Sequence, residues 1–367
     1  MDSDLLLVLV VGTALAFDFT NGFHDTANVV ATSISTRAMP PRIAVGYAAV
    51  LNFVGAFLSL QVAATVASGI IDAQGVTLTV LFAGLVGAIV WNLVTWYAGL
   101  PSSSSHALIG GMVGATLAAN GPGDVNWDGL LGKVMVPALI APVLAFVVAV
   151  IGILIAYRIT GRSSPGPVTR GYRGGQVVSG GLLALAHGTN DAQKTMGVIA
   201  LALVATGHLS AQNPDPPTWV IVSAATAIAL GTYIGGWRII RTMGTRIIKM
   251  DAAQGFTAQG AGAAVILAAS HVGFPLSTTH VISGAVMGSG AARRLSAVRW
   301  GVAGNIAIAW LLTLPAAGGT GAVVYGFTQI FGNGALGPVV VTILMLAGLA
   351  WFGARRVRAA APLEAPA

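Results

Sequence analysis

The sequence predicts an all-α polytopic membrane protein, built as an inverted-topology repeat with broken or re-entrant helices and about 11–12 membrane segments. Three observations lead to this fold class. Hydrophobic residues make up 55% of the 367 residues, and charged residues only 8%. Apolar stretches recur from Leu5 to Trp351, and roughly 20 apolar residues are enough for a helix to cross a bilayer. Two polar motifs each occur twice, and the loops beside the two copies differ in charge.

The apolar stretches, taken in chain order, define the expected membrane segments. Polar residues near the middle of the first and sixth stretches predict that these two helices are interrupted. The third and fourth stretches are expected either to span the membrane separately or to form a re-entrant pair, and the sequence leaves this choice open. The stretches cover residues 4–36, 43–67, 77–99, 103–119, 131–157, 176–207, 218–240, 253–270, 277–291, 301–326 and 337–354.

The net charge of +7 reflects membrane topology rather than nucleic-acid binding. Apart from Lys133 and Lys194, every Lys and Arg falls in a short cluster between or after the apolar stretches. Short loops rich in Lys and Arg mark the cytoplasmic side of a membrane. We therefore expect an external N-terminus, a cytoplasmic C-terminus, a lipid environment and no nucleic-acid partner. The chain has no cysteine, which excludes disulfides and thiolate metal sites.

The repeated motifs divide the chain into two related halves. "NGFHDTAN" at 21–28 matches "HGTNDAQK" at 187–194, and "PSSSSHALIGGMVG" at 101–114 matches "PLSTTHVISGAVMG" at 275–288. Matched loops have opposite charge character, as inverted halves require. The predicted units are a first membrane repeat at 1–157, a basic cytoplasmic linker at 158–175, a second membrane repeat at 176–336, and an added C-terminal helix with a short cytoplasmic tail at 337–367.

The first motif predicts a polar stripe on one helix in each half. His187, Asp191 and Lys194 are spaced to lie on one helical face, and Asn21, Asp25 and Asn28 have the same spacing. Ionisable groups inside a membrane are costly unless paired or hydrated, so they usually line a pathway or a site. The alternative is that Asp191 and Lys194 form a buried pair that only fixes packing.

The second motif predicts a binding site for an anion. In each copy a proline ends one apolar segment, and three successive hydroxyl residues then precede an apolar run, which is typical of a capped helix start. The free N–H groups and positive dipole of such a start attract an oxyanion. Capping alone explains one Ser-rich start, but two starts from inverted halves are expected to converge on one anion.

A carboxylate beside an anion site is informative about the ligand. Phosphate near neutral pH carries P–O–H donors that a carboxylate accepts, whereas sulfate carries none. A carboxylate also binds Na⁺ or takes a proton, and either event lowers the electrostatic cost of bringing phosphate close. Anion and cation would then bind cooperatively, as symport requires.

With these motifs identified, the chain resembles the PiT inorganic phosphate transporter family over nearly its whole length. "FDFTNGFHDTANVVAT", "LALAHGTNDAQKTMGV" and the paired "PSSSSH" and "PLSTTH" carry the resemblance. It implies an inverted-repeat symporter, without a resident cofactor, that moves inorganic phosphate with Na⁺ or H⁺. In bacteria this is often low-affinity uptake, sometimes of a metal–phosphate complex. The linker is far shorter than the cytoplasmic loop of eukaryotic relatives, so a bacterial cell membrane is expected.

The resemblance also implies roles for individual residues. It points to Asp25 and Asp191 as the coupling-cation carboxylates, where Na⁺ is the candidate metal, with Asn21 and His24 beside them. His24 stands where the family usually has Asn, and because His titrates near neutral pH this difference favours H⁺ coupling. The residues expected around phosphate are Asn28, Lys194, Asn190, Ser103, Ser104, Ser105, Ser277, Thr278 and Thr279.

Other functions remain as alternatives at this point. A sulfate permease on the same scaffold is disfavoured because the carboxylates suit a protonatable anion. An intramembrane Ser/His hydrolase lacks the isolated nucleophile turn expected of such enzymes. An anion channel would not concentrate its substrate. The sequence leaves open the coupling cation, the stoichiometry, co-transport of a divalent metal, and whether the chain forms a homodimer.

Overall fold

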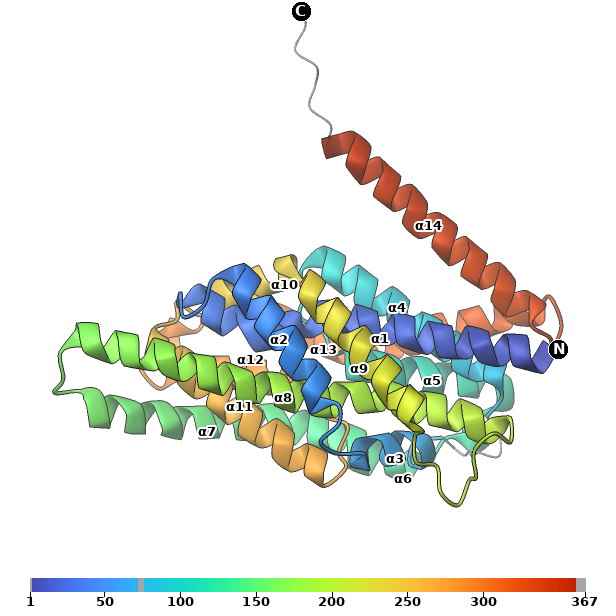
Figure 1. Ribbon diagram of the computed structural model, residues 1–367, viewed down its shortest axis with the longest axis horizontal. Helices are drawn as coiled ribbons and strands as arrows, with labels where there is room; N and C mark the ends of the chain where they lie inside the picture. Colours follow the sequence, from blue (N-terminus) through green and yellow to red (C-terminus); the bar gives the residue numbers. More distant parts are fainter. Residues whose placement is uncertain (1, 72–75, 361–367) are drawn as a thin grey trace, which may run out of the picture.

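A computed structural model describes residues 2–71 and 76–360. Within these residues the secondary structure is helical, with one isolated bridge between Ile71 and Val125 instead of a sheet. This confirms the predicted all-α membrane fold. Figure 1 shows most helices running along the long axis of the bundle, with the N-terminus at one end and the connection between α7 and α8 at the other.

The described helices before α14 fall into the two halves of the chain that the repeated motifs define. The first comprises α1 (Asp2–Ser35), α2 (Pro41–Gly55), α3 (Gln61–Ser68), α4 (Leu78–Ala98), α5 (Ser104–Asn120), α6 (Trp127–Gly129) and α7 (Val136–Thr160). The second comprises α8 (Pro165–Ala205), α9 (Thr218–Ile234), α10 (Trp237–Arg241), α11 (Ala252–His271), α12 (Thr278–Ala291) and α13 (Trp300–Gln329). Short 3-10 or π segments lie at Pro122–Asp124, Leu130–Met135, Thr242–Arg246 and Leu295–Ala297. The exact division into repeats stays a prediction.

The two motif helices differ from the sequence expectation because neither is interrupted. α1 runs for 34 residues through Asn21 and Gly22, and α8 runs for 41 residues through the whole second motif. Glycine is tolerated in these helices because neighbouring backbones pack where a side chain would stand. A Cβ on Gly22 would lie 2.4 Å from the carbonyl oxygen of Ile228 in α9, and one on Gly188 would lie 2.1 Å from that of Asn52 in α2.

The chain breaks instead at the ends of shorter helices. α9 and the segment from Trp237 to Arg246 are bent by 59° at Gly235, whose φ of 75° favours glycine. The turn between α4 and α5 begins at Gly99, with φ 67°, and carries Ser102 and Ser103, which are fully buried. α4 and α5 therefore pack as a hairpin around a buried turn, and because α4 by itself has the length and hydropathy of a span, the choice between spanning and re-entrant stays open.

Fewer helices than expected are long enough to cross a membrane unaided. Among the described residues, five helices have the length and hydropathy for a span, or six if the bent pair counts as one. α2, α5, α9 and α12 contain only 14–17 residues. At 1.5 Å per residue, such helices cover at most about 26 Å, which is less than a hydrocarbon core of roughly 30 Å. The number of helices that could span the membrane alone is therefore lower than the predicted 11–12 segments, because several of the helices are broken or too short.

The two halves interlock rather than stand side by side. α5 packs against α13 and α12 against α7, each pair joining one half to the other. Close approach depends on glycines at the same place in both motif copies: a Cβ on Gly114 would lie 2.0 Å from the carbonyl oxygen of Gly318, and one on Gly288 would lie 2.3 Å from that of Phe146. Small residues allow such helix contacts in membranes.

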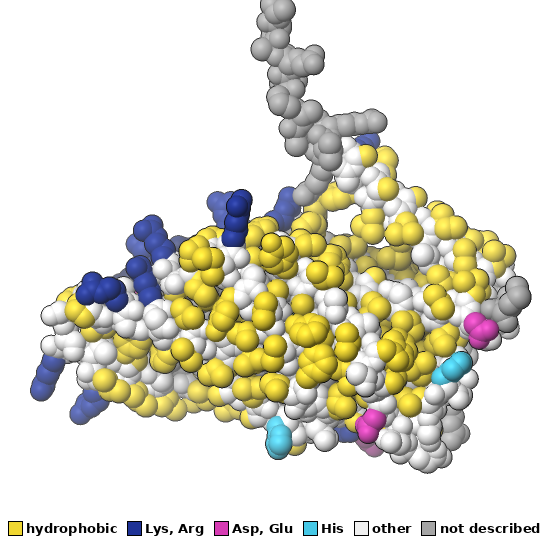
Figure 2. Space-filling view, viewed as in Figure 1, with side chains coloured by type: hydrophobic (Ala, Val, Ile, Leu, Met, Phe, Trp, Pro, Cys, Tyr) yellow, Lys and Arg dark blue, Asp and Glu magenta, His cyan; other side chains and the backbone are white. Residues whose placement is uncertain are grey.

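Two segments outside the repeats depart from their expected form. Most of the predicted linker at 158–175 is helical, because α7 continues to Thr160 and α8 begins at Pro165. The expected extra helix is α14 (Leu336–Ala360), which diverges from the bundle in Figure 1. Figure 2 shows most of the visible Lys and Arg side chains towards the end where α7 meets α8, and the visible Asp side chains towards the other end.

Candidate functional site

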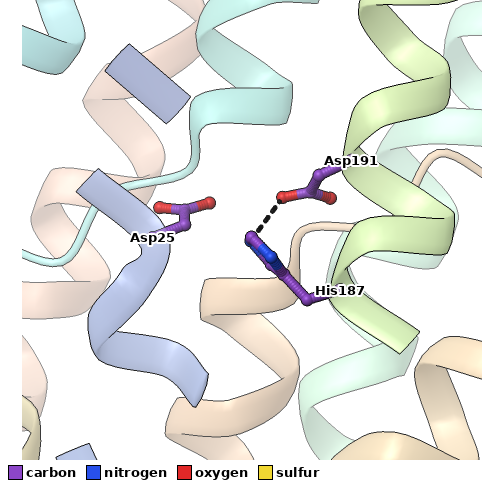
Figure 3. Close-up of side chains that lie close together, drawn as sticks. All are labelled: Asp25, His187 and Asp191. Atoms are coloured by element: carbon purple, nitrogen blue, oxygen red, sulfur yellow. Dashed lines mark ion pairs between the residues drawn. The ribbon is translucent and has the colours of Figure 1, made fainter. Parts of the chain in front are cut away.

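The polar stripes of α1 and α8 meet in the middle of the bundle. Asp25 on α1 is 2% exposed, and Asp191 on α8 is fully buried. Figure 3 shows their carboxyl groups on facing helices, with the ring of His187 between them. One ligand atom from each of these three residues lies within 4.8 Å of the other two. This group could hold a cation, because each member offers an oxygen or a ring nitrogen.

On α8, the Asp191 carboxylate is paired with a buried ammonium. Lys194 Nζ contacts Asp191 Oδ1 and also donates to Ser105 Oγ at 2.6 Å and to the carbonyl oxygen of Leu276 at 2.8 Å. His187 Nε2 lies 3.1 Å from Asp191 Oδ2. The Lys194 side chain therefore joins α8 to the starts of both α5 and α12.

On α1, the Asp25 carboxylate contacts a histidine instead of a lysine. His24 Nδ1 lies 2.6 Å from Asp25 Oδ1, and His24 Nε2 lies 3.0 Å from Thr95 Oγ1 and 3.3 Å from Ser102 Oγ. Asp25 also accepts weak hydrogen bonds of 3.4 Å from Thr278 and Thr279. The contact of Asp25 in this half is therefore an imidazole, where Asp191 has an ammonium.

The second motif forms two capped helix starts, as its sequence predicts. Ser103 Oγ accepts from the backbone N–H of His106, and Ser277 Oγ accepts from that of His280. The two starts meet, since Ser105 donates to the Leu276 carbonyl at 3.0 Å. Positive helix ends and Lys194 thus converge on one buried region.

Hydroxyl groups at these starts connect the two carboxylates. Thr278 Oγ1 lies 3.4 Å from Asp25 Oδ2 and 3.4 Å from Asp191 Oδ2. Asn28 donates to Thr279 Oγ1 at 2.8 Å and to Thr278 Oγ1 at 3.3 Å. Among the described residues, the buried hydroxyl of Ser104 has no hydrogen-bond partner, so it is available to donate to a ligand.

Not every predicted residue reaches this centre. Asn190 donates to Ser270 Oγ at 2.8 Å and to the Phe274 carbonyl at 3.2 Å, which directs it to the end of α11. Asn21 Oδ1 is buried without a partner. The rings of His106 and His280 meet edge to face, with their centroids 4.7 Å apart.

Three polar residues at the site were not predicted from the motifs. Thr95 and Ser102 contact His24, and Asn52 Oδ1 lies 3.1 Å from His187 Nδ1. Thr95 and Asn52 each lie within a mostly apolar stretch, which is a signal that was available in the sequence. That signal alone does not say which motif each residue contacts. Asn52 on α2 is distant along the chain from α8, and Thr95 on α4 is distant from α1.

The family comparison is decisive at this point. The model of the phosphate transporter family matches residues 21–170 and 158–321. The chain belongs to the phosphate transporter family. The match includes both motif copies and both helix starts, and it confirms the PiT resemblance. Members of this family are transporters and not enzymes, so the hydrolase alternative is removed.

Individual relatives agree with this assignment. A probable low-affinity inorganic phosphate transporter of Mycobacterium tuberculosis is 54% identical over 352 residues, covering 96% of this chain and 84% of the relative. A protein of the same description from Bacillus subtilis is 46% identical over 323 residues, covering 88% and 96%. A solved structure of a sodium-dependent phosphate transporter is 25% identical with a TM-score of 0.80, covering 89% of this chain and 99% of that one. This family member is thus a multi-pass membrane protein.

Proposed function

We propose that this protein imports inorganic phosphate as a secondary active transporter, by symport with a monovalent cation through alternating access. One observation carries the proposal: two capped helix starts and Lys194 converge beside the facing carboxylates of Asp25 and Asp191. The first group of features attracts an oxyanion, and the second attracts a cation. The descriptions of the bacterial relatives support phosphate as the anion.

The buried charges give a physical reason for symport. Lys194 compensates Asp191, whereas Asp25 faces the same space in contact with His24 and near His187, without an ammonium beside it among the described residues. Phosphate brought into this space would meet an uncompensated carboxylate unless a cation had bound or a proton had been taken up. Because the cation lowers the cost of binding phosphate, phosphate must raise the affinity for the cation by the same factor.

The proposed phosphate ligands come from both halves. Ser104, Ser105, Thr278 and Thr279 would supply hydroxyl donors, and Asn28 and Lys194 would supply nitrogen donors. Ser103 and Ser277 would act through the helix starts, because their hydroxyl oxygens already accept backbone N–H groups. Asn190 would lie at the edge of the phosphate site, because its amide group bonds to residues at the end of α11.

Burial of the site supports alternating access. Asp25, Asp191 and Lys194 are each at most 2% exposed, as expected for a site in an occluded form. The interlocked hairpins would have to move relative to the rest of the bundle to open the site to either side. An open anion channel would instead keep a continuous aqueous path.

Charge distribution supports an orientation in the bacterial cell membrane. The end with most of the Lys and Arg side chains would face the cytoplasm, and the N-terminus would face outward. The C-terminus would then lie inside. Cross-linking of single-cysteine variants in intact cells would test this orientation and also whether the chain forms a homodimer.

Phosphate uptake into proteoliposomes tests the proposal and identifies the cation. An inward H⁺ gradient and an inward Na⁺ gradient are imposed separately, with and without Mg²⁺ to detect a metal–phosphate complex. The contact of His24 with Asp25 favours H⁺, and the sodium dependence of the solved relative favours Na⁺. Phosphate accumulation in vesicles on which no cation gradient is imposed would overturn symport. Absence of phosphate accumulation under every condition would overturn phosphate transport itself.

Sulfate transport is the second candidate, and the same vesicles exclude or establish it. Thr278 bridges two carboxylates, an environment that suits an anion carrying its own O–H donors. We expect excess sulfate to leave phosphate uptake nearly unchanged. Full competition at equal concentrations would contradict phosphate selectivity.

A further inference from the structure

A cavity lined by basic side chains lies at the end of the bundle where α7 meets α8 (Figure 1). Its volume is about 440 Å³, and it lies where the loop before α11 meets the loop between α12 and α13. The other lining residues are neutral, and none carries a carboxylate. The cationic lining residues are Lys249, Arg293, Arg294 and Arg299.

The protein itself does not neutralise these cations. Among residues 2–71 and 76–360, no ion pair includes any of the four. The carboxylate of Asp251, two residues after Lys249, instead accepts from the backbone N–H of Gln254 and from the Tyr157 hydroxyl, each at 2.8 Å. Arg299 Nη1 donates to the Thr245 carbonyl at 3.0 Å, which holds its guanidinium beside the cavity. Like charges around one space repel one another, and a bound anion removes this repulsion.

Two exposed apolar residues adjoin the basic lining. Leu295 and Trp300 are next in sequence to the lining residues Ser296 and Arg299, and they are 68% and 52% exposed. Trp300 Nε1 donates to the Leu295 carbonyl at 3.0 Å, which holds these two residues together. Trp300 is also the first residue of α13, a helix long and apolar enough to span a membrane, and tryptophan is typical of the headgroup level. Membrane topology accounts for basic loops, but it does not account for a cavity with an apolar rim.

We propose that this cavity binds the headgroup of an anionic phospholipid. The four cations would contact the phosphodiester oxygens, and Leu295 and Trp300 would contact the first part of the acyl chains. A dissolved anion would gain nothing from these two apolar side chains. Lipid binding at this place goes beyond the proposed transport of phosphate. Because α12 begins at Thr278 and ends two residues before Arg293, a bound lipid would join the far end of this helix to α11 and α13.

Native mass spectrometry of the purified full-length protein in a neutral detergent tests the site. The protein is titrated with phosphatidylglycerol, and phosphatidylcholine, which has no net charge, is the control lipid. Each Lys or Arg near an anionic lipid favours binding about fivefold, so Arg293→Gln with Arg294→Gln should weaken phosphatidylglycerol binding about 25-fold. Replacing both arginines by Lys should retain most of it. Arg158→Gln with Arg162→Gln is the matched control, because it removes equal charge from α7 and its following turn, outside the cavity lining.

Further measurements separate a lipid from a free anion. Leu295→Asn should weaken phosphatidylglycerol binding about threefold, because an apolar contact with the acyl chain is lost. Displacement of the lipid by an equal concentration of inorganic phosphate would identify a free-phosphate site and contradict the lipid site. Equal affinity for both lipids, or equal losses in the Gln variants of the cavity and of the control pair, would also contradict it. If the cavity variant does not fold, Lys249→Gln should weaken binding about fivefold, and unchanged affinity would overturn the proposal.

Discussion

The α1 and α8 copies of the polar motif hold a carboxylate at matching positions but surround it with different partners. Asp191 contacts the ammonium of Lys194, which is anchored to Ser105 and to the Leu276 carbonyl. Asp25 contacts His24 and the hydroxyls of Thr278 and Thr279. In the proposed mechanism, the Lys194 ammonium of the α8 half would contact the anion, and the Asp25 carboxylate of the α1 half would take up the cation.

Asp191→Asn should have the largest effect. It leaves the Lys194 ammonium buried without its carboxylate, which costs about 3–5 kcal/mol in comparable buried pairs. We expect concentrative phosphate uptake to fall by at least about 100-fold while membrane insertion is retained. Uptake in proteoliposomes, normalised to inserted protein, measures this, and normal uptake would remove Asp191 from the coupling role.

Lys194→Asn gives α8 the residue that α1 has at Asn28, and it should act mainly on phosphate affinity. Loss of one buried positive charge and its bond to Ser105 should raise the half-saturating phosphate concentration by about 10- to 100-fold. Arg173→Asn is the control, because its side chain bonds the Thr36 carbonyl away from the site. An equal effect of both variants would mean that the charge acts non-specifically.

Changing Ser104 and Thr278 together to Ala should weaken phosphate binding less. Each substitution removes one hydroxyl donor, worth about 1 kcal/mol, so the half-saturating concentration should rise about 10- to 30-fold. Thr226→Ala is a suitable control, since that hydroxyl is exposed and bonds within its own helix. An unchanged concentration would place the anion elsewhere.

His24→Asn should have the smallest effect on rate and should change the pH dependence instead. The substitution removes the imidazole ring beside Asp25 but keeps a polar side chain. If H⁺ is the coupled cation, we expect uptake driven by a proton gradient to fall about tenfold. Uptake across a series of pH values measures this, and an unaltered pH profile would show that His24 carries no proton.

The sequence predicted some contacts well and others incompletely. The capped starts at Ser103 and Ser277 depend on local geometry, and the structure reproduces both. The expected interruption at Asn21 and Gly22 was wrong, because α1 stays helical where Gly22 packs on α9 and because His24 finds polar partners outside α1. Those partners include Thr95 and Ser102, which only the packing of α4 against α1 reveals.

The sequence alone determined the helical membrane fold, the repeated motifs and the residue types available to an anion and a cation, because these follow from composition, helical spacing and capping. The tertiary structure decided which charges meet. Lys194 contacts Asp191 locally, but its bond to Ser105 and the bridging position of Thr278 depend on how helices from both halves interlock. Such contacts join residues distant along the chain, and hydropathy or spacing contains no information about their separation in space.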